Sequence, residues 1–136
     1  MSEPGRPPAE APVIRVIAMP ADTNPAGDIF GGWLMSWMDL AAGTVAARRC
    51  HGRAATVAAE AMVFLRPVMV GDEVSFYADL VAEGRTSMKI HVEAWRRARE
   101  DEQTAKVTEA TFSFVSLGED RRPRPLPPLE PGMMRS

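Results

Sequence analysis

The sequence has little of what disulfide-stabilised, metal-binding or membrane-spanning proteins need. Its 136 residues include one cysteine, Cys50, and two histidines. A single cysteine excludes an internal disulfide and a cysteine-based zinc site, and two histidines leave little for a histidine-rich metal centre. No segment approaches the ~20 consecutive apolar residues of a membrane-spanning helix. We therefore expect a cytoplasmic protein with no bound metal and no membrane partner.

The sequence also lacks an excess of charge of either sign. Sixteen basic and 18 acidic residues give a formal net charge of −2. A protein that binds a nucleic-acid duplex usually carries a strong basic excess, which this chain does not have. We expect no nucleic-acid partner.

Prolines are scarce in the middle of the chain and crowded at its ends. Of 12 prolines, four precede residue 13 and five follow residue 122. The stretch between them is about a hundred residues long, enough for one hydrophobic core and too short for two typical domains. We predict a flexible N-terminal tail over residues 1–12, one domain over 13–118 and a proline-rich C-terminal tail over 119–136.

One long helix is predicted over residues 33–49, WLMSWMDLAAGTVAARR. The segment contains no proline, many good helix formers and two basic residues at its end, where they complement the helix dipole. It is apolar nearly all round, which is typical of a helix in the centre of a fold. Its only acid, Asp39, shares a face with the small residues Ser36 and Gly43. That face could admit a ligand or a second chain.

The other regular segments have the composition of strands. Residues 13–19 are rich in β-branched side chains and end at Pro20. Further strands are predicted at 55–65, 73–82, 86–95 and 105–117. The 55–65 segment is apolar on both alternations except at Glu60, as expected for a central strand covered on both faces.

Together these elements predict an α+β fold. Short connections between successive strands favour an antiparallel sheet of five to six strands, wrapped around the one long helix. Such a sheet in a single chain leaves apolar residues on its second face and unpaired edges. Assembly of two or more copies is the usual way to cover both.

The segment AMPADTNPAGDIFGGW at residues 18–33 resembles the bacterial YciA-type acyl-CoA thioesterases and the related cytosolic long-chain acyl-CoA hydrolases. The resemblance continues in Met38-Asp39, VAAEAMVFLRP (57–67), VGD (70–72), GRTSMK (84–89) and FSFV (112–115). It implies a hotdog fold over about residues 13–118. It also implies an acyl-CoA substrate, no cofactor, a homodimer as the minimal unit and a homohexamer built as a trimer of dimers.

By the same resemblance, the active site forms between two subunits. Asp39 of one subunit would face the 24–32 segment of the other, with the thioester between them. Asp39 would act as general base on water or as nucleophile, and the residues leave this choice open. Asn24 and the backbone amides of Gly31 and Gly32 would polarise the thioester carbonyl, since backbone N–H groups at a helix start can stabilise an oxyanion.

Coenzyme A carries phosphates, which cationic side chains and hydroxyl donors recognise. The resemblance places its nucleotide near the turn at residues 83–85. We therefore predict that Arg85, Ser87 and Lys89 bind coenzyme A, with Arg66 as a further candidate.

Other interpretations of the same residues stand beside these. Asp39 could cap a neighbouring loop, the Gly31-Gly32 pair could permit a tight turn, and Arg85 could be a solvated charge. A hotdog dehydratase needs a catalytic histidine, and the predicted helix has none. The alternative function is a regulatory protein that binds acyl-CoA without hydrolysing it.

Overall fold

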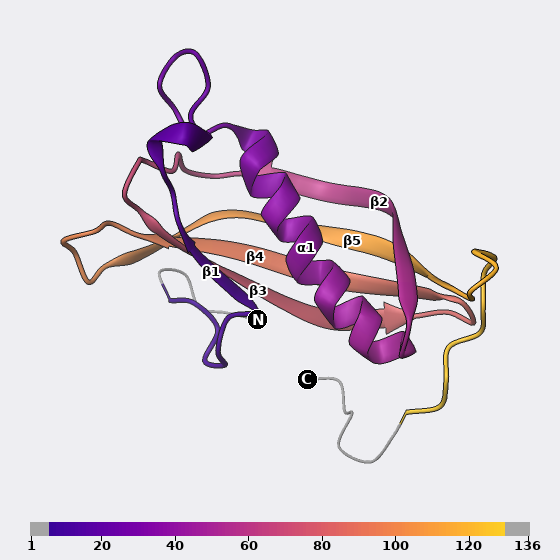
Figure 1. Cartoon of the computed structure of the whole chain (residues 1–136). Helices are drawn as coiled ribbons and strands as arrows, with labels where there is room; N and C mark the ends of the chain where they lie inside the picture. Colours follow the sequence, from indigo (N-terminus) through magenta and orange to yellow (C-terminus); the bar gives the residue numbers. More distant parts are fainter. Residues whose placement is uncertain (1–5, 130–136) are drawn as a thin grey trace.

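The computed structural model of the chain describes residues 6–129. Figure 1 shows one long helix lying across a curved sheet. The elements are β1 (Ile14–Ile17), the short 3-10 helix η1 (Pro20–Asp22), α1 (Gly31–Cys50), β2 (Arg53–Phe64), β3 (Glu73–Glu83), β4 (Ser87–Arg97) and β5 (Thr104–Leu117). Apart from η1, which the sequence analysis did not predict, their order along the chain is the predicted one.

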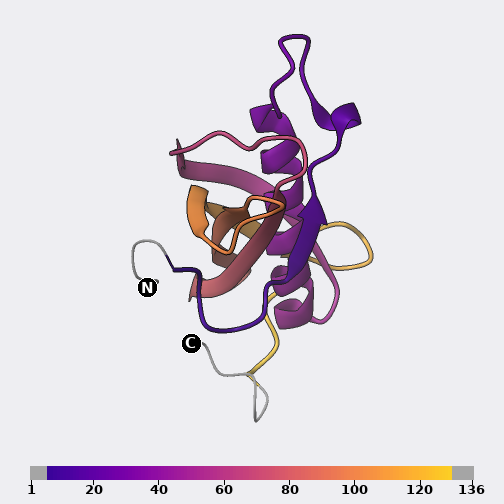
Figure 2. The same cartoon turned by 90° about the vertical axis from the view of Figure 1, so that its left-hand side faces the viewer.

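The five strands form one sheet in the order β1-β3-β4-β5-β2, and every neighbouring pair is antiparallel. The sheet curves around α1, which covers one of its faces (Figures 1 and 2). The α+β fold class and the wrapped antiparallel sheet are thus confirmed. No helix within residues 6–129 is both long enough and apolar enough to cross a membrane.

The hydrophobic core lies between α1 and the sheet. Alternate residues of the central strand β4 point toward the helix, as the period of two along a strand requires. These are Met88, Ile90, Val92 and Ala94, all fully buried. Met38, near the middle of α1, is fully buried in the same cluster. This packing fixes which side of α1 faces the sheet and which side remains open.

α1 begins two residues earlier and ends one residue later than predicted. Gly31 and Gly32 form its first turn, and they do not precede it. A β-carbon at Gly31 would lie 3.3 Å from the Phe64 ring, so glycine there allows β2 to approach the helix start. The helix ends at Cys50, and the capping residue His51 has a left-handed φ of 54° and donates its backbone N–H to the carbonyl of Ala47.

The prediction that the 55–65 segment forms a central strand is wrong. Within residues 6–129, β2 lies at the edge of the sheet and pairs only with β5. Its side chains are largely exposed, including those of Val57 (60%) and Phe64 (51%). Apolar residues on both faces of a strand are equally compatible with burial inside one chain and with burial against a second one.

Candidate active site

Asp39 lies in the third turn of α1 and is half-buried. Its Oδ1 atom accepts a hydrogen bond of 2.5 Å from the hydroxyl of Thr56. Thr56 belongs to β2 and is paired with Phe114 of β5, whose ring is buried in the core, so its side chain points to the helix side of the sheet. The hydrogen bond fixes one carboxylate oxygen of Asp39 and leaves lone pairs on the other available to a ligand or water.

The surface of α1 around Asp39 is open in the single chain. Met35 and Leu40 are 43% and 56% exposed, and Ser36 is also exposed. The expectation of a helix enclosed on every side is therefore wrong for one copy of the chain. Apolar side chains that flank a carboxylate on an open helix face are suited to contact a second molecule.

Asn24 lies in the loop between η1 and α1. Its side-chain Oδ1 accepts the backbone N–H groups of Ala26 and Asp28 at 3.0 and 3.1 Å. These two bonds hold the side chain by its oxygen, so its Nδ2 atom is the part that could donate to a ligand. The loop closes at a bridge between Thr23 and Ile29 and projects beyond the helix start (Figure 2).

The backbone N–H groups of Gly31 and Gly32 lie in the first turn of α1, where a helix supplies no acceptors for them. Next to them is a shallow pocket of about 290 Å³, lined by Ile29, Gly31, Leu34, Phe64, Leu65, Arg66, Pro67 and Val68. Arg66 donates from Nη1 to the carbonyl of Lys106 at 2.8 Å. The predicted site residues Gly31 and Arg66 therefore border one apolar pocket at the helix start.

The other predicted coenzyme A ligands lie around the turn between β3 and β4. Arg85 is exposed in this turn, and Ser87 is the first residue of β4. Lys89 forms an ion pair with Glu60 of β2, with 3.4 Å between Nζ and Oε1 and both side chains about half exposed. The turn is close to the C-terminal end of α1, at the opposite end of the fold from the connection that contains Arg66 (Figure 1).

One chain does not bring all the predicted site residues together. Among the hydrogen bonds of residues 6–129, none joins Asn24 to Asp39. Arg66 and Arg85 are separated by most of the length of α1, and a 20-residue helix is about 30 Å long. The sequence reasoning also missed Thr56, because a threonine in a strand gives no local sign that its hydroxyl meets a carboxylate 17 positions away.

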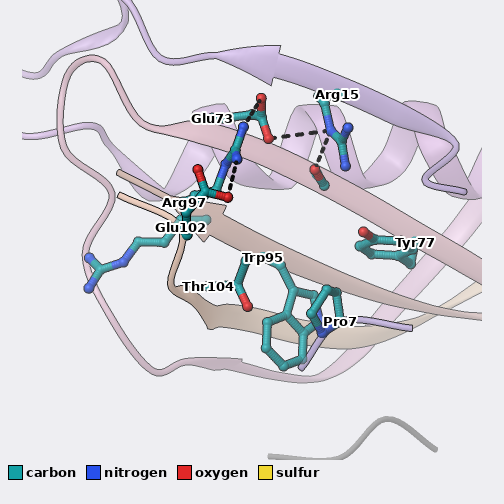
Figure 3. Close-up of a pocket in the computed structure, with 10 residues that line it drawn as sticks. Pro7, Arg15, Glu73, Tyr77, Trp95, Arg97, Glu102 and Thr104 are labelled. Carbon is teal, nitrogen blue, oxygen red and sulfur yellow. Dashed lines mark hydrogen bonds and ion pairs between the residues drawn. The ribbon is translucent and has the colours of Figure 1, made fainter. Parts of the chain in front are cut away.

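A second depression, of about 240 Å³, lies at one end of the outer face of the sheet (Figure 3). Ion pairs cross it: Glu73 contacts Arg15 at 3.6 Å and Arg97 at 3.2 Å, and Arg97 also contacts Glu102 at 3.5 Å. None of the predicted site residues lines this depression. Because these four charges are paired with one another and the Arg96 guanidinium donates to the carbonyl of Pro67, we assign the depression no functional role.

The outer face also carries a group of three potential metal ligands, His91, Glu93 and Glu109. The ammonium of Lys106 lies 3.4 Å from a carboxylate oxygen of Glu109 and 3.9 Å from one of Glu93. The Trp95 indole also donates to Glu93 at 2.8 Å. These contacts already supply positive charge and donors to both carboxylates, so the group is satisfied as an ion-pair network.

The curved antiparallel sheet around a single long helix defines this protein as a hotdog-fold protein. Two solved structures share the fold closely. The hexameric thioesterase from Yersinia pestis is 44% identical with a TM-score of 0.84, and the match covers 89% of this chain and 98% of that one. A hexameric broad specificity acyl-coenzyme A thioesterase is 42% identical with a TM-score of 0.84, covering 90% of this chain and 85% of that one.

Sequence comparison gives the same relationship. The family profile of the thioesterase superfamily matches residues 26–103. The acyl-CoA thioester hydrolase YciA of Salmonella typhimurium is 52% identical over 118 residues, which are 85% of this chain and 89% of that protein. An uncharacterised acyl-CoA thioester hydrolase of Zymomonas mobilis is 57% identical over 90% of this chain and 82% of its own length. The chain belongs to the thioesterase superfamily, among the relatives of YciA.

Proposed function

We propose that this protein is an acyl-CoA thioesterase, which hydrolyses acyl-CoA to a free carboxylic acid and coenzyme A. The observation that carries the proposal is the half-buried carboxylate of Asp39, held by Thr56 on an open face of the central helix. It occurs in a chain that is 52% identical to an acyl-CoA thioester hydrolase.

In the proposed reaction a water molecule attacks the thioester carbonyl. Asp39 takes a proton from that water, the carbonyl carbon becomes tetrahedral, and the carbon–sulfur bond then breaks. The thiolate of coenzyme A leaves and takes up the proton, so that acyl-CoA and water give acid and free thiol. Direct attack by Asp39, with a mixed anhydride that water then hydrolyses, uses the same residues.

The developing oxyanion needs donors, and we propose that these come from a second copy of the chain. Nδ2 of Asn24 and the first N–H groups of α1, at Gly31 and Gly32, are candidates because hydrogen bonds within the fold leave them available. The projecting Asn24 loop and the exposed apolar edge of β2 support a site shared by two chains.

We propose a homodimer as the smallest active unit and a homohexamer, a trimer of dimers, as the assembly. Pairing at the β2 edge would satisfy its free backbone groups and cover Val57 and Phe64. Solved relatives at 42% and 44% identity are hexameric thioesterases. The nucleotide of acyl-CoA is assigned to Arg85 and Ser87, with Lys89 as a secondary contact. Arg66 lies at the opposite end of the fold in the same chain, so it would reach that nucleotide only from a second chain.

The test replaces the carboxylate of Asp39 by an amide of the same shape, Asp39→Asn. We expect kcat/KM for acyl-CoA to fall at least ~100-fold, the scale of a lost general base, with the assembly unchanged in size. Asp101→Asn, at the exposed turn between β4 and β5, is the matched control and should retain activity.

Near-normal turnover by Asp39→Asn would remove Asp39 from the chemistry. If the unaltered protein binds acyl-CoA and releases no thiol from any acyl chain in a panel of saturated, branched and aromatic substrates, the regulatory alternative is the better description.

A further inference from the structure

Part of the chain that follows β5 is bound to the body of the protein. Residues 123–127, here called the C-terminal strap, run past the end of α1 and the β3–β4 turn. The backbone N–H of Arg124 donates to the carbonyl of Ser116 at 2.8 Å, and that of Leu126 donates to the carbonyl of Arg85 at 2.9 Å. The Leu126 side chain packs against the hydrophobic core. Both backbone and side chain therefore fix the strap.

Two further hydrogen bonds, one from a strap side chain and one from a helix side chain, join the strap to the C-terminal end of α1. Nη2 of Arg124 donates to the carbonyl of Cys50, the last residue of α1, at 2.7 Å. Nη1 of Arg49 donates to the carbonyl of Pro127, also at 2.7 Å. The strap thus spans the end of the helix and the neighbouring turn.

Arg49 is the centre of this arrangement. It is only 6% exposed, and its Nε and Nη2 atoms pair with the two carboxylate oxygens of Glu83 at 2.9 and 3.0 Å. A planar guanidinium can make this bidentate pair and still direct Nη1 to Pro127, which an ammonium cannot do. One buried cation therefore joins α1, the last residue of β3 and the strap.

These contacts converge on the turn that carries Arg85. Glu83 precedes Arg85 by two residues and is held by Arg49, while the Arg85 carbonyl is held by Leu126. The carbonyl of Thr86 in turn accepts the backbone N–H of Ser116 at 2.8 Å. Glu83 at the start of the turn and Arg85 and Thr86 within it are thus held by residues outside the turn, yet Arg85 keeps an exposed side chain.

We propose that Arg49 and the C-terminal strap are positioning elements for the nucleotide of acyl-CoA. They hold the backbone of the β3–β4 turn in the conformation in which Arg85 and Ser87 meet the phosphates. This inference rests on the proposed function. A turn fixed before binding loses less conformational freedom when the nucleotide arrives, so its loss weakens nucleotide binding. Asp39 lies ten residues from Arg49, about 15 Å along α1, and its chemistry is unaffected.

The first test alters the strap in the full-length protein. Leu126→Pro removes the N–H that binds the Arg85 carbonyl, while Leu126→Met keeps that N–H and a side chain of similar volume. Each variant is assayed with an acyl-CoA and with the pantetheine thioester of the same acid, which lacks the nucleotide. We expect Leu126→Pro to raise KM for acyl-CoA at least fivefold, with kcat and both pantetheine parameters within twofold of the unaltered protein. Leu126→Met should match the unaltered protein on both substrates.

The second test addresses the buried cation. Arg49→Lys keeps the charge and loses the bidentate geometry, and Arg48→Lys changes the exposed neighbouring arginine in the same way. Arg49→Lys should show the same selective rise in KM for acyl-CoA, and Arg48→Lys should show none. If circular dichroism shows that Leu126→Pro does not fold, the KM of Arg49→Lys for acyl-CoA decides whether the proposal holds.

If activity falls equally with acyl-CoA and with the pantetheine thioester, the strap only stabilises the fold and the proposal is wrong. An unchanged KM for acyl-CoA in these variants would also overturn it. Calorimetry with free coenzyme A separates this inference from the proposed function. If the unaltered protein binds coenzyme A without hydrolysing acyl-CoA, the proposed function is wrong. A weaker affinity of Arg49→Lys for coenzyme A would even then support the positioning role of Arg49 and the strap. Absence of coenzyme A binding by the unaltered protein would refute the positioning role.

Discussion

At the scale of single residues, the chemistry of the candidate site depends on what surrounds Asp39. Thr56 from the neighbouring strand donates a 2.5 Å hydrogen bond to the carboxylate, and the helix face beside it is open. A carboxylate with one fixed oxygen has a defined orientation toward a ligand, because rotation of its side chain would break that bond. We therefore regard Thr56 as a positioning residue for Asp39.

Thr56→Val removes the hydroxyl and keeps the shape of the side chain. We expect kcat to fall by about tenfold, because proton transfer is efficient only when the base is held within hydrogen-bonding reach of the water. Thr56→Ser, which retains the hydroxyl, should recover most of that loss. Steady-state kinetics of the two variants provide the measurement.

Thr44→Val is the matched control, because among the described residues the Thr44 hydroxyl bonds only to the helix carbonyl of Leu40, at 3.0 Å. It should leave kcat within twofold. A normal kcat for Thr56→Val would show that the hydrogen bond from Thr56 is not needed to position Asp39.

At the scale of elements, β2 is the strand whose position bears on how two copies of the chain would join. It has 12 residues, lies at an edge of the sheet and exposes Val57 and Phe64. The opposite edge strand, β1, has only four residues. A long apolar edge offers free backbone groups together with a hydrophobic surface, the combination that pairs with another strand. We expect β2 to be the edge along which two copies join.

Val57→Lys places a charge on that edge. We expect it to dissociate the dimer, because a buried ammonium without a partner costs several kcal/mol. Hydrolysis should be lost with the dimer. Light scattering after size-exclusion chromatography gives the mass of the species.

The control for this experiment is Ile17→Lys, a comparable change at an exposed position of β1, which should leave at least a dimer intact. If Val57→Lys behaves like Ile17→Lys, the subunits join elsewhere.

At the scale of the whole molecule, the proposed active unit is larger than the chain. The Asn24 loop projects away from the sheet, and no hydrogen bond within residues 6–129 brings it to Asp39. A two-fold dimer repeats each contact, so it would create two equivalent sites, each with Asp39 from one chain and Asn24 from the other.

Subunit mixing tests this arrangement. Asn24→Ala and Asp39→Ala chains are each expected to be nearly inactive, and random exchange makes half of the dimers hybrid. Each hybrid has one intact and one doubly altered site. Because half of the dimers are hybrid and half of their sites are intact, about a quarter of the unaltered activity should return. The measurement is thiol release after exchange has been verified by mass. No recovery would place each site within one chain.

The local character of each segment could be read from the sequence, because helix propensity and side-chain alternation act over a few residues. The helix at 33–49 and the strands after it follow from such patterns, and the family resemblance selected Asp39 within them. The start of α1 differed by two residues and its end by one, since the Gly31-Gly32 pair carries weak helix propensity and gives no local sign that it forms the first turn.

Partners that are distant along the chain were decided only by the tertiary structure. Nothing local distinguishes a central strand from an edge strand with the same apolar pattern, and so the sequence alone places β2 in the centre of the sheet. The Thr56–Asp39 hydrogen bond and the attachment of Pro127 to Arg49 likewise join residues 17 and 78 positions apart. Sequence determined which residues can form a helix, a strand or a reactive carboxylate. Packing decided which of them meet, because contacts between distant segments depend on how the whole chain closes around its core.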